Sequence, residues 1–412
     1  MLLNRWKETL ARSHDRPAIF DGDEVIRFRD LDEQLGELPE ADGPVVASGS
    51  ARELVIATLR GWRDRVPVLP VERAGARLPA LTDIPEGVAH LKLTPGTDGM
   101  PRTVRFTASQ IAADADRIVR AMGLTPEIPN LATISLAHSY GFSSVVLPLL
   151  LHGIPLRTVE VPFPAVVAAA WAGHEAMVVP AVPSMWRAWL RSGILENAPI
   201  HLAVSAGAPL PLDLERSAWE AHGLKLHNFY GASECGGISW DPTPEPRTEA
   251  TDLGEPLPGV KVSLDENGRF LIESDSVALG YDHSRNGVKL GGGKFLTTDV
   301  GRLENGRLHL DCHADGHINV AGRKIGPGRV EAVLLGTGLV NRIRVFGIPS
   351  QDPERVDEVA ALVPVDTDLA ALRSAATAEL AGWETPRQWF TDPTAWNLSR
   401  MELRKRFASR RS

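Results

Sequence analysis

The segment TPGTDGMPRT at residues 94–103 combines residue types that suit the binding of phosphate oxygens. Gly96 and Gly99 can adopt positive φ and bring backbone N–H groups close to a ligand, while Thr94 and Thr97 supply hydroxyl groups. The apolar runs on either side predict two strands. Clusters of Thr, Gly and Pro also mark ordinary hairpin turns. The segment alone therefore leaves a phosphate loop and a plain turn as alternatives, and the plain turn is the simpler.

Polar residues also follow directly after other apolar runs. LATISLAH at 131–138 ends in the polar stretch HSYGFSS, and HLAVS at 201–205 continues into AGAPLP. In open α/β sheets, the loops at the carboxyl ends of strands build the ligand crevice. We therefore expect these segments to lie at that crevice.

The composition indicates an ordinary globular chain of two or three domains. The 412 residues include 52 acidic and 44 basic side chains, with a net charge of -8 and no long block of one sign, which argues against a nucleic-acid partner. Cys235 and Cys312 lack metal-ligand spacing and are expected to be free thiols in a reducing compartment. The N-terminus lacks signal-peptide features, and the apolar segments are too short to span a bilayer. We expect a cytoplasmic protein without a membrane span.

An α/β fold is predicted because strands alternate with helices through roughly the first three hundred residues. GPVVASG, ARELVIATLRGWRDR and VPVLPVE form one such strand, helix and strand unit. After Trp240, short strands joined by Asn-Gly turns predict a β-rich subdomain. The remainder forms an α+β unit of normal domain size. The expected domains are 1–314, including the β-rich subdomain at 238–314, and 315–412.

Five segments occur in an order that resembles the adenylate-forming superfamily of acyl-CoA synthetases, peptide-synthetase adenylation domains and firefly-type luciferases. They are TPGTDGMPRT, LAHSYGFSSVVLPLLLHGIPL, SAGAPLP, NFYGASECGG, and TTDVGRLENGRLHL followed by RKIGPGRVEAVL. The resemblance covers nearly the whole chain and favours the phosphate loop at 94–103. It implies a large α/β N-terminal domain and a small, mobile α+β C-terminal domain that rotates about Asp315. A plain linker aspartate is an equal alternative for Asp315.

The resemblance implies that ATP and Mg²⁺ activate a carboxylic acid as an acyl-adenylate, with release of pyrophosphate. Ser233 would donate to the α-phosphate and Glu234 would hold Mg²⁺, a role for which a carboxylate is a suitable hard ligand; the alternative for Glu234 is a solvated loop carboxylate. Asp299 would accept both ribose hydroxyls, or else form an Asx turn. The other residues assigned to ATP are Thr94, Gly96, Thr97, Gly99 and Arg102 at the phosphates, and Gly207, Ala208, Pro209, Tyr230 and Gly231 at the adenine.

The same resemblance assigns the acyl pocket to His138, Tyr140, Gly141 and Ser205. His138 would admit or shield the carboxylate, although a lone histidine is more often structural. Relatives that adenylate amino acids carry an Asp where this chain has Tyr140. A buried ammonium without an acidic partner is unfavourable, so we expect an apolar or aryl acid without an α-amino group.

Several residues depart from the pattern of the superfamily. Pro95 and Asp98 stand where Ser and Thr are common, and Cys312 and His313 replace the Gly and Arg of the hinge segment. Near the C-terminus, Arg400 matches the lysine that bridges the carboxylate and the α-phosphate. A shift of register would place Lys405 there instead. The segment RMELRKRFASRR also reads as a basic amphipathic tail that could meet an acidic carrier protein.

The sequence thus supports an acid–thiol ligase whose acceptor is CoA or the phosphopantetheine of a discrete acyl carrier protein. The alternative is a nucleotide-binding pseudoenzyme of the same fold, motivated by the departures above. An oxidative luciferase-like enzyme needs the same adenylate but has no distinguishing feature here.

Overall fold

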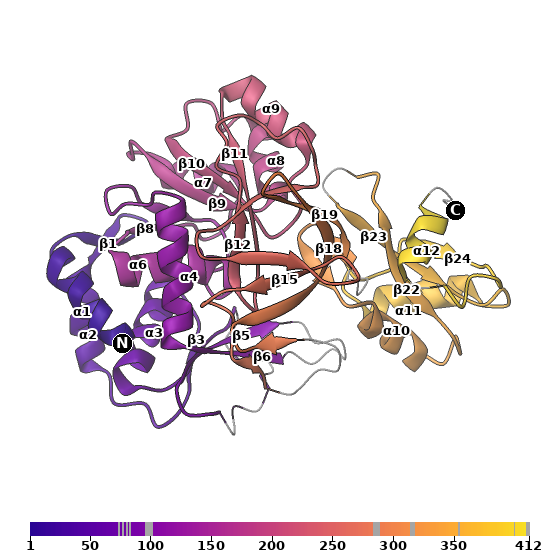
Figure 1. The fold of residues 1–412 in the computed structure, drawn as a ribbon, viewed down its shortest axis with the longest axis horizontal. Helices are drawn as coiled ribbons and strands as arrows, with labels where there is room; N and C mark the ends of the chain where they lie inside the picture. The colour runs from indigo at the N-terminus through magenta and orange to yellow at the C-terminus, as the bar shows by residue number, and fades with distance from the viewer. Residues whose placement is uncertain are drawn as a thin grey trace. The chain divides into compact units, whose positions relative to one another are not determined.

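The computed structural model describes the chain apart from residues 73–74, 76–77, 80, 82–83, 95–101, 283–288, 314–317, 353–354, 399 and 409–412 (Figure 1). For residues 311–313, 324, 332 and 401 it describes the backbone alone. Gly96, Thr97, Gly99 and Asp315, which the sequence assigns to the phosphate loop and the hinge, lie outside the described residues.

The described residues form two compact units. The first contains residues 1–94, 102–297 and 301–311, and the second contains residues 298–300 and 312–412. The domain limit predicted between residues 314 and 315 falls in a segment that is not described, so its position stays a prediction.

The first unit begins with helices and a small mixed sheet. This sheet has the order β16-β6-β5-β4-β3, with β3, β4 and β5 parallel and β6 antiparallel to β5. Thr94 pairs with Arg102, so the strands predicted on both sides of the segment at 94–103 are confirmed. The elements are α1 (Leu2–Ser13), β1 (Pro17–Asp21), β2 (Glu24–Arg27), α2 (Phe28–Glu37), β3 (Val45–Ala47), α3 (Ala51–Asp64), β4 (Val68–Pro70), β5 (Val88–Thr94), β6 (Arg102–Thr107) and α4 (Ala108–Ala121).

A row of parallel strands follows, in the order β11-β10-β9-β7-β8. Helices α8 and α9 lie together beside β10 and β11 (Figure 1). The elements are β7 (Asn130–Ala132), α5 (Ser139–Gly141), the π-helix η1 (Phe142–Val146), α6 (Leu147–His152), β8 (Leu156–Thr158), α7 (Pro164–Trp171), β9 (Met177–Ala181), α8 (Pro183–Ser192), β10 (Ile200–Ser205), α9 (Leu212–His222) and β11 (Leu226–Ala232).

Antiparallel strands extend this row into the predicted β-rich part. The sheet that results has 14 strands among the described residues. Asn305 and Gly306 have φ of 51° and 79°, the conformation that tight hairpin turns require. The elements are β12 (Gly236–Trp240), β13 (Asp252–Pro256), β14 (Lys261–Leu264), β15 (Arg269–Glu273), β16 (Gly280–Tyr281), β17 (Leu290–Gly291), β18 (Lys294–Glu304) and β19 (Arg307–His313).

The second unit is built on a three-stranded sheet of order β22-β23-β24 with its own apolar core. Its elements are β20 (Ile318–Val320), β21 (Arg323–Ile325), α10 (Pro327–Gly336), β22 (Arg344–Pro349), β23 (Asp357–Leu362), α11 (Leu369–Glu379), β24 (Gln388–Phe390) and α12 (Arg400–Phe407). The predicted α/β fold class is confirmed.

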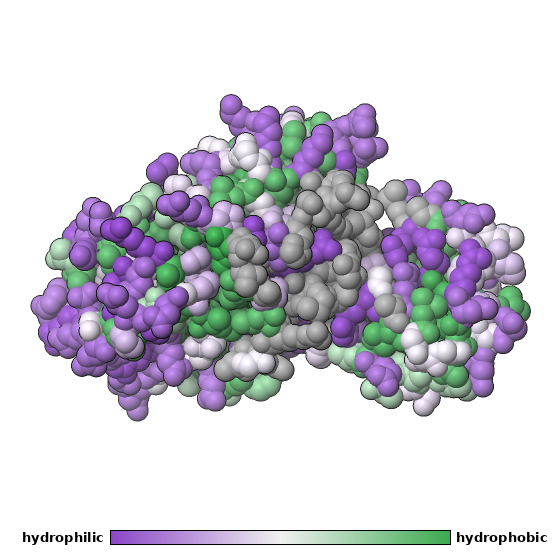
Figure 2. Space-filling view, turned by 90° about the horizontal axis from the view of Figure 1, so that it is seen from below, coloured by the Kyte–Doolittle hydropathy of each residue, from purple (hydrophilic) through white to green (hydrophobic). Residues whose placement is uncertain are grey.

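Amphipathic helices cover the core of the first unit. Trp6, Phe28 and Leu31 are fully buried, and Figure 2 shows hydrophilic residues over much of the surface formed by the N-terminal part. Such helices bury one apolar stripe and leave the opposite face to water. No described helix combines the length and the apolar character needed to cross a membrane.

Candidate active site

The carboxyl ends of β10 and β11 bring together two of the predicted ATP segments. Ser205 is the last residue of β10 and lies opposite Asn228 of β11 in a parallel register. Gly207 follows with φ of 81°, which turns the chain into the segment 207–209. Because parallel strands end at the same edge of a sheet, this segment lies at the edge reached by Tyr230.

Tyr230 lies on β11 and is partly exposed. Its ring meets Phe270 of β15 edge-on, with 6.4 Å between centroids. The next residue is held against the neighbouring strand, because a Cβ at Gly231 would lie 2.7 Å from the carbonyl oxygen of Gly236. A partly exposed tyrosine ring on such a fixed backbone can stack on a planar base.

The predicted acyl-pocket residues lie next to this edge. The ring of Tyr140 stacks on that of Phe229, with 6.0 Å between centroids. Burial raises the pKa of Tyr140 far above its usual value, so its hydroxyl stays neutral. The hydroxyls of Tyr140, Ser144 and Ser205 are buried, and no described residue bonds to them. Such hydroxyls can serve a polar group of a bound molecule.

His138 precedes the short helix α5. Its Nδ1 accepts from the backbone N–H of Tyr140 at 3.4 Å, so the imidazole caps the chain that carries the tyrosine. Gly141 approaches the carbonyl of Ser135 so closely that a Cβ would lie 2.2 Å from its oxygen. The local backbone therefore requires a glycine at this position.

Glu234 lies on the turn between β11 and β12, directly after the partly buried Ser233. The hydroxyl of Tyr281 donates to Glu234 Oε1 at 2.7 Å, and no other partner of this carboxylate is found among the described residues. Its second oxygen remains for a ligand. Mg²⁺ commonly takes one or two carboxylates and completes its shell with phosphates and water. Glu234 fits that role, although no three His, Cys, Asp or Glu side chains of the described part of the chain converge as a preformed metal site.

The other predicted ATP residues are positioned as follows. Thr94 and Arg102 form the paired ends of β5 and β6, where the segment of the predicted phosphate loop starts and ends. Asp299 is buried in the middle of β18, and residues 298–300 group with the second unit. Its predicted role toward the ribose stays a prediction.

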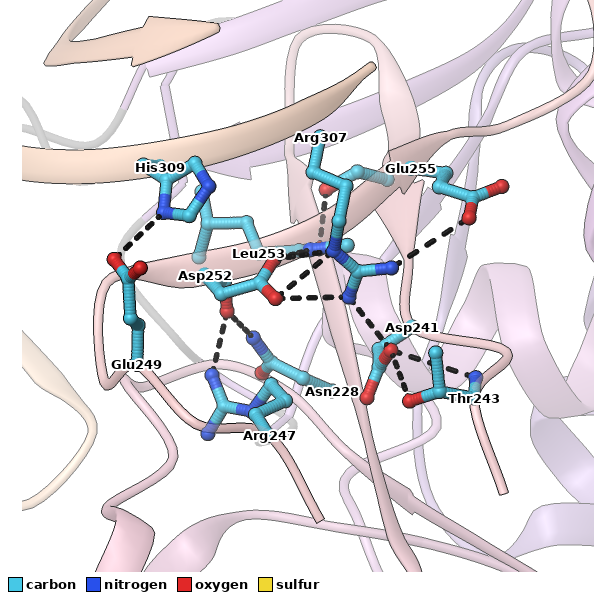
Figure 3. Close-up of polar contacts among 12 residues, drawn as sticks. Asn228, Asp241, Thr243, Arg247, Glu249, Asp252, Leu253, Glu255, Arg307 and His309 are labelled. Carbon is cyan, nitrogen blue, oxygen red and sulfur yellow. Dashed lines mark hydrogen bonds and ion pairs between the residues drawn. The ribbon is translucent and has the colours of Figure 1, made fainter. Parts of the chain in front are cut away.

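A buried network of charges fixes the strands behind the predicted adenine segments (Figure 3). Asp241, directly after β12, is fully buried and accepts from Lys225 at 2.8 Å and from Arg307 of β19 at 2.7 Å. Arg307 also contacts Asp252 of β13 at 2.9 Å and the exposed Glu255 at 3.5 Å. One guanidinium thus joins three strands.

The same network reaches the predicted ATP segments themselves. Arg247 pairs with buried Glu215 at 2.9 Å and donates to the carbonyl oxygen of Leu210 at 2.6 Å, directly after the segment 207–209. Asn228, two residues before Tyr230, donates to the carbonyl oxygen of Asp252 at 3.0 Å, as Figure 3 shows. The buried charges therefore support the segments that the sequence assigns to ATP.

Arg400, the predicted catalytic residue, begins α12 in the second unit. Its guanidinium donates to both carboxylate oxygens of Glu331, at 2.9 and 2.8 Å, and to the carbonyl oxygen of Val345 at 3.0 Å. These contacts tie α12 to α10 and β22. Leu403 and Phe407 are buried on the same helix, so residues 400–407 pack into the unit as a helix, whereas Lys405 is exposed.

Two relevant groups escaped the sequence analysis. Tyr281 contacts Glu234 from 47 positions away, and nothing in the sequence around either residue indicates this contact. Lys92 and His90 are buried on β5, inside the apolar run VAHLKLT. The sequence could have indicated these two residues, because polar side chains two positions apart in an apolar strand lie on the same face of the sheet.

Comparisons with known proteins place these observations in a family. A family model described as AMP-binding enzyme matches residues 43–281. The feruloyl-CoA synthase of Amycolatopsis sp is 28% identical over 427 residues, which cover 92% of this chain and 84% of the relative. The 2-succinylbenzoate–CoA ligase of Salmonella typhimurium is 24% identical over 451 residues, covering 97% of this chain and 95% of the relative.

Solved structures show the same fold. A double mutant of the o-succinylbenzoate CoA synthetase from Bacillus subtilis has a TM-score of 0.79 at 19% identity, covering 98% of both chains. An amide bond synthetase from Marinactinospora thermotolerans has a TM-score of 0.77 at 22% identity, covering 98% of this chain and 99% of the other. Because the family model spans more than half of the sequence, the chain belongs to the AMP-binding enzymes, that is, to the adenylate-forming superfamily.

Proposed function

We propose that this protein is an ATP- and Mg²⁺-dependent ligase that joins a small carboxylic acid to the thiol of CoA through an acyl-adenylate. The main support for this proposal is the arrangement at the ends of β10 and β11. Ser205, the segment 207–209 and Tyr230 share this edge of the sheet, and Glu234 occupies the following turn. Relatives named as CoA ligases support this activity.

In the first step, a carboxylate oxygen of the acid attacks the α-phosphorus of ATP, and pyrophosphate leaves with the bridging oxygen. Ser233 and Arg102 would donate to the phosphates, and Tyr230 would hold the base. Glu234 would hold Mg²⁺, which would supply positive charge to the phosphate oxygens. In the second step, the thiol sulfur attacks the acyl carbon, AMP leaves, and the thiol proton passes to solvent.

The acid we favour is apolar or aromatic and lacks an α-amino group. Tyr140 is neutral and stacks on Phe229, so this part of the pocket presents aromatic surface and supplies no charge for an ammonium group. The buried hydroxyls of Ser144 and Ser205 leave room for one polar substituent on the acid.

The acceptor we favour is CoA, because the relatives are named for it. The phosphopantetheine of a discrete carrier protein carries the same thiol and belongs in the same experiment. A cytosolic location, expected from the low cysteine content, is part of this proposal.

The test is acid-dependent exchange of pyrophosphate into ATP, followed by mass spectrometry of thioester products. The acids should include ferulate, 2-succinylbenzoate, sulfoacetate, fatty acids and an amino acid, each offered with CoA or with a carrier protein. We expect exchange and a CoA thioester with at least one aryl or apolar acid. Glu234→Gln should reduce exchange at least a hundredfold, and Glu255→Gln serves as a surface control. Nucleotide binding without exchange for any acid would reject the ligase in favour of a pseudoenzyme.

A further inference from the structure

The buried Arg117 of α4 has no role in the reaction described above, yet its side chain is only 5% exposed. Its guanidinium donates through Nε to the carbonyl oxygen of Pro258 at 2.9 Å, and through Nη1 to the hydroxyl of Ser276 at 2.9 Å. Its Nη2 donates to a carboxylate oxygen of Asp275. Arginine is rarely buried unless its donors are paired. Arg117 therefore fastens two separate loops to α4.

The hydroxyl of Ser276 carries this contact onward to the β11–β12 turn. Ser276 is 1% exposed, and its hydroxyl donates to the carbonyl oxygen of Cys235 at 2.7 Å. A guanidinium can only donate hydrogen bonds, so the Ser276 oxygen accepts from Arg117 and its own proton remains for Cys235. A charged donor also polarises the hydroxyl and strengthens the bond that the hydroxyl donates. Arg117 thus acts on the turn through one serine.

The segment 276–281 also contacts Glu234, the residue before Cys235, on its backbone and on its side chain. The N–H of Ala278 donates to the carbonyl oxygen of Glu234 at 2.9 Å. The hydroxyl of Tyr281 donates to Oε1 of the same residue at 2.7 Å. A side chain that holds this segment therefore also holds the predicted metal ligand.

Helix α4 contacts the other end of the turn directly. Asp114 lies three residues before Arg117, on the same face of the helix, and its Oδ1 accepts from the N–H of Gly237 at 2.9 Å. A Cβ at Gly236, where φ is 75°, would lie 2.2 Å from the Asp114 carboxyl group. The helix thus packs closely against the turn, and its second contact, through Arg117 and Ser276, reaches the residue next to Glu234.

We propose that Arg117 is a positioning residue for Glu234: through Ser276 it fixes the segment 276–281 against the β11–β12 turn, and this contact sets the orientation of the carboxylate. The inference depends on the proposed function for the role of Glu234 toward Mg²⁺, but the effect on the turn itself does not. A planar guanidinium suits the task because it meets three acceptors in fixed directions, whereas a lysine ammonium is a single point charge.

The first test uses amide hydrogen exchange of the full chain without nucleotide. Ser276→Ala removes the bond to Cys235 with little change in volume, so exchange in peptides covering residues 234–238 and 276–281 should speed up roughly fivefold. Thr58→Val is the matched control. It also removes a fully buried hydroxyl, which donates to the carbonyl oxygen of Leu54 at 2.8 Å within α3, and it should leave both peptides unchanged.

A double variant tests whether Arg117 acts through Ser276. Arg117→Met should speed exchange in the same peptides by roughly tenfold, because it removes the donor to Ser276 and the anchor of the segment. The Asp275 side chain that loses its partner is 72% exposed and can turn to water. Arg117→Met/Ser276→Ala should exchange within about twofold of Arg117→Met, since both changes remove one connection. If the two effects multiply instead, the connection through Ser276 is wrong.

Calorimetric titration of ATP at varied Mg²⁺ concentration tests the consequence for the metal. Ser276→Ala and Arg117→Met should each raise the Mg²⁺ concentration needed for half-maximal ATP binding, the latter by about tenfold, as for other residues that orient metal ligands. KM for the acid should change little.

Two results would overturn the inference: an unchanged turn in Ser276→Ala, or a looser turn with an unchanged Mg²⁺ requirement in both variants. If wild type binds no nucleotide while Ser276→Ala still loosens the turn, the proposed function fails and the positioning of the turn by Arg117 and Ser276 stands.

Discussion

At the scale of single residues, the two oxygens of the Glu234 carboxylate have different surroundings, and we propose that only the second one binds Mg²⁺. Tyr281 occupies Oε1 at 2.7 Å, and this bond limits the directions in which Oε2 can point. A ligand that binds one metal ion through one oxygen gains from such restriction, since less rotational freedom is lost on binding. The tyrosine hydroxyl is therefore a more informative target than the carboxylate itself.

Removal of that hydroxyl should separate metal binding from acid binding. We expect Tyr281→Phe to raise the Mg²⁺ concentration at half-maximal pyrophosphate exchange by about tenfold, with little change in KM for the acid. Tyr140→Phe is the matched control, because it also removes one tyrosine hydroxyl but lies in the predicted acyl pocket. It should alter KM for the acid and leave the Mg²⁺ requirement unchanged. Equal effects of both variants on Mg²⁺ would contradict these assignments.

Arg400 is the residue whose sequence-based role and structural contacts differ most. One guanidinium nitrogen of Arg400 donates to both carboxylate oxygens of Glu331 and another donates to Val345, so these contacts explain the residue without a substrate. We therefore expect Arg400→Gln and Glu331→Gln to lower the melting temperature by similar amounts. The double variant should be little worse than either single variant, since both remove the same pair.

Pyrophosphate exchange by the same variants gives the decisive comparison. If Arg400 is only structural, exchange at a temperature where all variants are folded should fall less than about tenfold. A loss of several hundredfold in Arg400→Gln, with Glu331→Gln near wild type, would instead support the catalytic role that the sequence predicts.

At the scale of elements, Arg307 makes β12, β13 and β19 depend on one another. Its partner Asp241 is fully buried, whereas Glu255, on the other side of the guanidinium, is 56% exposed. If the buried carboxylate of Asp241 loses its charge, Arg307 and Lys225 are left partly unpaired. If the exposed carboxylate of Glu255 is removed, water can take its place.

The two carboxylates should therefore differ strongly in their contribution to stability. We expect Asp241→Asn to reduce the free energy of unfolding by roughly 3 kcal/mol, and Glu255→Gln by less than about 1 kcal/mol, both measured by urea unfolding at neutral pH. Similar values for the two variants would mean that the network is not tightly coupled.

The contribution of Asp241 to the free energy of unfolding should also depend on pH. Burial opposes ionisation of Asp241, but hydrogen bonds from Lys225 and Arg307 outweigh it and lower the pKa below the ordinary 3.8. A carboxyl group with a lowered folded-state pKa stabilises the fold above its unfolded pKa and loses that effect as pH falls toward the folded value. The difference between wild type and Asp241→Asn should therefore hold at neutral pH and shrink below pH 3.8.

The elements were largely predictable from the sequence, whereas their long-range partners were not. Alternating strands and helices and the Asn-Gly turn at Asn305 depend on neighbours in the chain, so local patterns indicate them. The contact of Arg307 with Asp241 joins residues 66 positions apart. Nothing in either local segment specifies the other, because such pairing is decided by the packing of the whole sheet.

In the candidate site, too, some residues were predictable from the sequence and others were not. The roles of Tyr230 and Glu234 were predicted from the resemblance of their segments to the superfamily, and these roles stay predictions. Tyr281 contacts Glu234 from a distant part of the chain, and its residue type alone indicates no function. Only this contact distinguishes it from an ordinary tyrosine.

At the scale of the whole molecule, the chain consists of two units that each have an apolar core. The resemblance to the superfamily predicts that the smaller unit rotates about Asp315 between the two half-reactions. Hinges of this kind are a few residues that absorb a change in backbone angles. Restricting one of them should affect the half-reactions unequally.

Asp315→Pro should leave pyrophosphate exchange within about threefold of wild type and slow formation of the CoA thioester at least tenfold, because proline fixes φ. Exchange and single-turnover thioester formation would be measured on the same preparation, with Asp315→Ala as the control that removes the carboxylate but keeps the backbone free. Equal loss of activity in both half-reactions would argue that Asp315 is a plain linker residue. Equal loss with Asp315→Ala would argue for a role of its side chain.

The burial of Cys235 within the β11–β12 turn has a practical consequence. At 1% exposure, its sulfur is shielded from alkylating reagents while the surrounding turn stays closed. Slow labelling of this one thiol would then record how often the native protein opens at that point, and a saturating ligand bound there should slow the labelling further. Labelling of Cys235 would thus report on the opening of the turn that carries Glu234.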